Sequence, residues 1–166
     1  YNLALAEFER YESAAAGRRH PWKALALSNL NRKKEAFASL EDILGMDPKD
    51  PAFQRERWES ALGVYALLLS RAGDYRKAEQ YIARAIQSDT GLGHFHHSEY
   101  NIASAYALMG KPRQAVEWLR KSAEHGFPCY PLFASDPNLN SLRGDPEYES
   151  LLRKMKAEWE HYRATL

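Results

Sequence analysis

The chain has 166 residues, 45% of them hydrophobic, which is enough to bury one continuous core in a single domain or array. Lysine and arginine number 23 against 22 acidic residues, and the net charge of +1 offers no clustered basic surface for nucleic acid. The single cysteine, Cys129, excludes an internal disulfide, and no apolar run approaches the roughly 20 residues that a membrane-spanning helix needs.

Apolar residues recur at intervals of three and four along most of the chain, which predicts helices. We expect them at about residues 1–15, 21–30, 33–45, 51–72, 75–88, 96–109, 112–125 and 146–163. The first begins with the chain itself, so we expect a fragment of a longer protein. Asp50 and Pro51 favour the start of the fourth helix, because aspartate accepts from free amides and proline fits the first turn.

One spacing of small and large residues occurs three times between residues 17 and 126. The clearest copy is Ala103, Tyr106, Gly110, Ala115, Leu119 and Ser122; it overlays on Ala66, Leu69, Gly73, Ala78, Ile82 and Ala85, and more weakly on Ala24, Leu27, Asn31, Ala36, Leu40 and Ile43. Antiparallel helices cross closely only where small residues meet. The pattern therefore predicts stacked helix pairs with turns at Asn31, Gly73 and Gly110.

Two copies contain the short motifs Gly73-Asp74-Tyr75 followed by Ala78, and Asn101-Ile102-Ala103 followed by Tyr106. These motifs resemble the tetratricopeptide repeat family, whose unit is a helix-turn-helix of about 34 residues. The resemblance implies an all-α solenoid of antiparallel helix pairs with a C-terminal capping helix. It places three units at about 17–50, 51–92 and 94–126, and makes residues 1–16 a helix that remains from a preceding repeat.

Residues 127–166 differ in character from the repeats. The segment from Phe127 to Phe133 is too rich in proline for a helix and too apolar for a free linker, so we expect it to pack across the end of the array. A short helical turn is expected at residues 136–142. The last helix places Tyr148, Leu151, Leu152, Met155, Trp159 and Tyr162 on one face. Such a helix can cap the array; the alternative is a segment that binds a partner or a membrane.

Several stretches of the last seventy residues form a second pattern: Tyr100 through Leu119, Gly126-Phe127, residues 136–139 and residues 142–146. They resemble the C-terminal region of bacterial multidomain signalling proteins, in which a serine/threonine kinase, cyclase or transcriptional regulator precedes tetratricopeptide repeats. This resemblance implies a non-catalytic scaffolding or sensory module in the cytoplasm. The module would be extracytoplasmic if a transmembrane segment preceded it in the parent protein.

In the tetratricopeptide family, ligands lie on the concave face formed by the first helix of each unit. The resemblance therefore implies a mixed, rather apolar partner-binding groove lined by Arg18, Leu25, Asn29, Ser60, Leu67, Arg71, His97, Tyr100, Ser104 and Leu108. Positions that clamp a chaperone's terminal carboxylate in some members hold apolar residues such as Pro21 and Leu25, so that ligand is not expected.

The expected partner is a protein or an apolar peptide, without nucleic acid, membrane insertion or cofactor. The sequence is also compatible with a homo-oligomer. In the alternative arrangement, the terminal helix or the first helix fills part of the groove from within the chain.

A histidine cluster suggests metal binding as the alternative to a protein-binding function. His94, His96 and His97, with Glu99 nearby, could hold zinc or nickel in a metal-dependent sensor or enzyme. The sequence lacks a His-Glu-x-x-His motif and a second ligand cluster, and histidines at a helix start are commonly surface residues. No residues are predicted to be catalytic, so the chain is not expected to be an enzyme.

Overall fold

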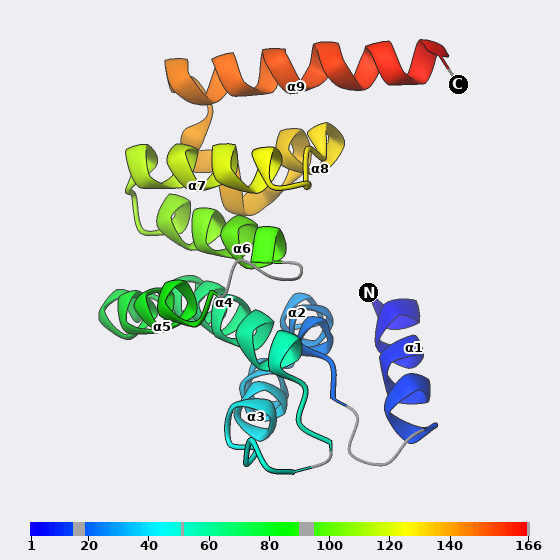
Figure 1. Ribbon diagram of the computed structural model, residues 1–166. Helices are drawn as coiled ribbons and strands as arrows, with labels where there is room; N and C mark the ends of the chain where they lie inside the picture. Colours follow the sequence, from blue (N-terminus) through cyan, green and yellow to red (C-terminus); the bar gives the residue numbers. More distant parts are fainter. Residues whose placement is uncertain (15–18, 51, 90–94, 166) are drawn as a thin grey trace.

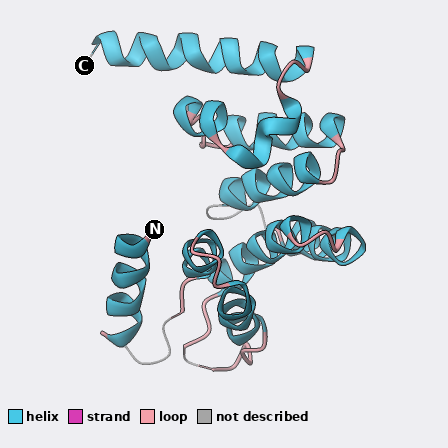
Figure 2. Cartoon of the chain, turned by 180° about the vertical axis from the view of Figure 1, so that it is seen from behind, coloured by secondary structure: helices cyan, strands magenta, loops and turns pink. Residues whose placement is uncertain are grey.

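The computed structural model describes residues 1–14, 19–50, 52–89 and 95–165. Its helices are α1 (Asn2–Ser13), α2 (Pro21–Asn29), α3 (Lys33–Leu44), α4 (Arg55–Arg71), α5 (Tyr75–Ser88), α6 (Phe95–Leu108), α7 (Pro112–Glu124), α8 (Tyr130–Ser135), the 3₁₀ helix η1 (Pro137–Leu142) and α9 (Pro146–Thr165). The described residues contain no strand (Figure 2). The predicted all-α fold is confirmed.

Three helix pairs, α2 with α3, α4 with α5 and α6 with α7, are stacked in chain order (Figure 1). The first helices also pack on one another, α2 against α4 and α4 against α6. Helix α4 lies at the centre, and every residue from Ala61 to Ser70 is buried. This stacking is the predicted solenoid of antiparallel helix pairs.

The turn inside each pair uses a left-handed backbone. Its φ values are 61° at Asn31, 82° at Gly73 and 69° at Gly110. Glycine adopts this conformation without a Cβ penalty, and asparagine tolerates it better than most residues. The turns that the spacing pattern predicts therefore have one geometry, although the first of them lacks glycine.

Small residues lie where helices cross. Ala66 and Ala103, from the first helices of two pairs, are completely buried, and so are Ala78 and Ala115 from the second helices. At Gly63 the approach is closer still, since an added Cβ would lie 3.2 Å from the Cα of Ser98. Helices α4 and α6 thus pack almost backbone to backbone, and a larger side chain here would push them apart.

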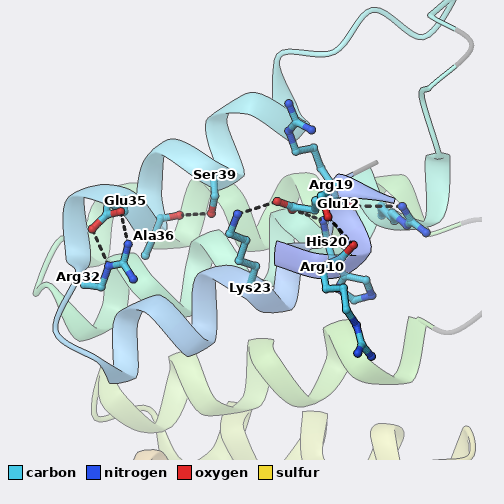
Figure 3. A network of polar contacts seen from close by, with 11 residues as sticks. Arg10, Glu12, Arg19, His20, Lys23, Arg32, Glu35, Ala36 and Ser39 are labelled. Carbon is cyan, nitrogen blue, oxygen red and sulfur yellow. Dashed lines mark hydrogen bonds and ion pairs between the residues drawn. The ribbon is translucent and has the colours of Figure 1, made fainter. Parts of the chain in front are cut away.

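Helix α1 packs chiefly against α2 and is joined to it by polar contacts. The ammonium of Lys23 lies 2.6 Å from the carboxylate of Glu12, and the His20 amide donates to the same carboxylate at 3.3 Å (Figure 3). Leu5 is the buried apolar residue of α1. Few apolar contacts therefore hold this helix in place.

The predicted start of the fourth helix is wrong. Helix α4 begins at Arg55, and residues 52–54 are not helical. The carboxylate of Asp50 accepts from the Ala52 amide at 2.7 Å, and the Asp50 carbonyl accepts from the Phe53 amide at 2.9 Å. These local bonds form a turn that competes with a helical start.

The proline-rich segment also differs from expectation, because residues 130–135 form the helix α8. Pro131 lies in its first turn, where the missing amide proton costs no hydrogen bond. Phe133 is fully buried, and its carbonyl accepts from the Tyr148 hydroxyl at 2.7 Å. The segment does pack on the array, and η1 follows as the expected short turn.

Helix α9 lies across the end of the stack (Figure 1). Tyr148, Leu151, Leu152 and Met155 are buried beneath its first half. Further along the same face, Tyr162 is exposed, so the second half of α9 covers less of the array.

Candidate functional site

A groove with a volume of about 580 Å³ lies on the face shared by α2, α4 and α6. Its floor consists of Trp22, Leu25 and Asn29 from α2, Leu67 and Arg71 from α4, and His97, Tyr100 and Asn101 from α6. Tyr1, which precedes α1, and residues between Phe127 and Asn138 complete the lining. Apolar and aromatic side chains dominate, with a few polar groups among them, as in many sites that bind ligands.

Side chains of the first and third helix pairs come into contact at the groove. The rings of Trp22 and His97 are 5.0 Å apart, edge to face. His97 in turn lies 4.8 Å from the ring of Phe127. A ligand in the groove would therefore contact all three helix pairs at once.

The structure places most of the predicted groove residues together. Leu25, Asn29, Leu67, Arg71, His97 and Tyr100 all line the groove. Ser60 lines a neighbouring hollow of about 360 Å³, which shares Trp22 and His97 with the groove. Arg18 lies outside the described residues.

Ser104 and Leu108 do not line the groove. Ser104 is completely buried and Leu108 is half-buried, because η1 packs against α6. The Ser141 hydroxyl, at the end of that segment, donates to the carbonyl of Ala107 at 2.7 Å. The family resemblance assigned both residues to the concave face, but η1 covers this half of α6.

One wall of the groove is held by a buried polar network. The Tyr100 hydroxyl donates to Oδ2 of Asp136 at 2.5 Å, and the backbone and side-chain amides of Asn138 each donate to Oδ1 at 2.8 Å. Burial, and then the negative charge of Asp136, raise the pKa of Tyr100, so its hydroxyl remains a donor. This wall comes from the segment before the last helix, and not from the terminal helix.

Arg71 connects the two sides of the groove. Its Nε donates to Oδ1 of Asn138 at 3.0 Å, and its Nη1 donates to Ser28 Oγ at 3.1 Å and to Asn29 Oδ1 at 3.3 Å. Burial lowers the pKa of Arg71, and the charge of Asp136 opposes that shift. Arginine remains protonated in proteins, so a partly buried cation lies in a mainly apolar groove.

The predicted metal ligands do not gather in the described part of the chain. The rings of His96 and His97 are 4.4 Å apart and pack against Phe127. Glu99 is buried, with Oε1 2.8 Å from Nδ1 of His125. Among the described residues no three His, Cys, Asp or Glu side chains are placed to hold a metal ion. His94 lies outside the described residues, so a site that includes it stays a prediction.

Several lining residues are absent from the sequence-based list: Trp22, Asn101, Phe127, Leu132, Asp136 and Asn138. Trp22 and Asn101 lie on α2 and α6, the helices that also carry predicted groove residues. The apolar run after residue 126 signalled that the segment is packed. The run did not indicate which surface the segment packs against. Tyr100 and Asp136 are 36 residues apart in the sequence, and a contact over that separation leaves no local pattern.

Residues 22–50, 59–90 and 97–124, together more than half of the chain, match the tetratricopeptide repeat. The chain belongs to the tetratricopeptide repeat family. No match was found among curated proteins, nor among solved structures.

Tetratricopeptide repeats form a generally non-catalytic family of protein–protein interaction modules. Membership therefore implies protein partners for this chain. No helix in the described residues is long and apolar enough to span a membrane.

Proposed function

We propose that the concave groove of this tetratricopeptide repeat protein binds a peptide segment of a partner protein. The observation that carries the proposal is the groove itself, where apolar side chains from all three helix pairs surround one hollow. A segment with apolar anchors would bury those side chains and gain affinity from the hydrophobic effect. The polar groups between them would fix its direction.

The wider role is proposed from the resemblance of the last seventy residues to tails of bacterial signalling proteins. In that setting the groove would recruit a partner to an upstream catalytic or regulatory domain, and the module itself would act as a scaffold or sensor. A groove already formed in the free protein suits this role, since little ordering entropy is lost on binding.

Trp22 provides the test of the groove. It lines the groove and is 37% exposed, so Trp22→Ser removes a large contact surface without opening the core. We expect purified wild-type protein to enrich peptides from a random library, and Trp22→Ser to bind those peptides at least about tenfold more weakly in fluorescence anisotropy.

Ile86→Ser is the matched control, because Ile86 is 40% exposed on α5, away from the groove. It should bind like the wild type. Equal losses in the two variants, or none in Trp22→Ser, would count against the groove as the binding surface.

A further inference from the structure

The guanidinium of Arg71 has unused hydrogen-bonding capacity. Its three bonds leave from Nε and Nη1, and all three acceptors, on Ser28, Asn29 and Asn138, are uncharged. Across the described ranges, no carboxylate forms a salt bridge with Arg71 and no acceptor is seen at Nη2. Two N–H groups of a cation that lines the groove thus remain for a ligand.

The carboxylate whose charge acts on Arg71 cannot supply that acceptor. Asp136 is 9% exposed, and its two oxygens already accept three hydrogen bonds from Tyr100 and Asn138. Asn138 lies between the two charged groups, donating to Asp136 and accepting from Arg71. The carboxylate of Asp136 and the amide oxygen of Asn138 therefore already accept hydrogen bonds, whereas the N–H groups at Nη2 of Arg71 have no acceptor among the described residues. A complementary ligand has to bring an acceptor, preferably a charged one.

Asn101 adds a second unused group on the same floor. It is 5% exposed and lines the groove, yet its side-chain amide makes no hydrogen bond within the described ranges. At the open groove, a peptide group of a ligand can satisfy both the donor and the acceptor of this amide. Asn101 therefore favours a ligand that presents its backbone to the floor.

We propose that the groove selects a peptide segment in which an aspartate or glutamate side chain accepts from Nη2 of Arg71, with apolar residues on the neighbouring floor. The inference rests on the proposed function and specifies its ligand. Because the single guanidinium of Arg71 bonds to α2 and to η1 at once, the walls are close together there. That space suits a side chain better than a passing backbone, so the carboxylate belongs to a side chain.

The test uses a random heptapeptide library with acetylated amino and amidated carboxyl ends, so that side chains supply the only carboxylates. We expect the wild-type protein to enrich peptides that combine Asp or Glu with apolar residues. Replacing that acid by its amide in the best peptide should weaken binding about tenfold or more, as the loss of a charged hydrogen bond implies. Added salt should also weaken the acidic peptide more than its amide version.

Arg71→Gln should lose the preference for the acid and keep the preference for apolar residues. Arg113→Gln, at an exposed arginine of α7, should behave like the wild type. If Arg71→Gln does not fold, the peptide-side change from acid to amide on the wild-type protein still decides the question.

The outcomes separate the two proposals. If no peptide is enriched, with amidated or with free carboxyl ends, the proposed function fails as well. If apolar peptides are enriched without an acid, or if Arg71→Gln keeps the acid preference, peptide binding stands and the role of Arg71 is wrong. A second library with the same sequences but free carboxyl ends covers the remaining case. If peptides are enriched only from that library, whatever their side chains, peptide binding stands and the side-chain assignment is overturned.

Discussion

His20 is the N-cap residue that precedes α2, and its surroundings favour the neutral imidazole. Its Nδ1 accepts from the Trp22 amide at 3.4 Å, and its ring packs between those of Phe8 and Trp22, each 5.1 Å away. Burial, followed by the nearby charge of Arg57, lowers the pKa of His20 below its ordinary 6.5, while Glu12 opposes the shift. Protonation would remove the capping acceptor and place a second positive charge beside Arg57.

This lowered pKa predicts a loss of stability in mild acid. The unfolded chain binds a proton at His20 more readily than the folded protein, so stability is present above pH 6.5 and falls as the pH drops below that value. His20→Asn keeps a capping acceptor that does not titrate. Between pH 7.5 and 5.5, we expect Tm by circular dichroism to fall less in His20→Asn than in the wild type.

His161→Asn is the control for titration elsewhere, since His161 is exposed on α9. It should follow the wild type. Identical pH dependence in all three proteins would show that His20 does not contribute.

At the scale of the helices, close crossings depend on small side chains. Ala66→Leu adds volume to a fully buried site in α4, and we expect it to destabilise the protein by about 1–3 kcal/mol in urea unfolding. Ala83→Leu makes the same change at an exposed position of α5, where little cost is expected. A similar loss in both variants would contradict tight packing at the crossing.

The sequence predicts the paired helices because they follow from a local period. The groove residues follow instead from the resemblance to the tetratricopeptide family, and six of the proposed ten line the hollow between the helix pairs. The spacing of Ala66, Gly73 and Ala78 defines a crossing and a turn within a few residues. By contrast, helix α8 and the wall around Asp136 depend on Tyr148 and Tyr100, which are distant in the sequence. The local sequence of a proline-rich segment does not indicate which distant residues it contacts. Its helix and its position beside the groove therefore could not be predicted.

At the scale of the whole molecule, we expect the free energy of local opening to be highest at the central helix α4 and to decrease towards the outer helices. Helix α4 packs against α2, α3, α5 and α6, whereas α1 packs chiefly against α2. Segments with few buried contacts open locally at lower free energy than the core. In hydrogen–deuterium exchange by mass spectrometry, we expect α1 amides to exchange fastest and α4 amides slowest. Equal protection in α1 and α4 would mean that the array opens only as one unit.

The edge-to-face contact between Trp22 and His97 gives the protein a built-in optical probe. The chain has four tryptophans, and among the described residues Trp22 is the one that lines the groove. Trp58 and Trp118 pack against the core, and Trp159 lies on α9. A ligand in the groove would therefore change the surroundings of one indole and leave those of the other three as they are, so a shift in tryptophan emission on binding can be assigned to Trp22.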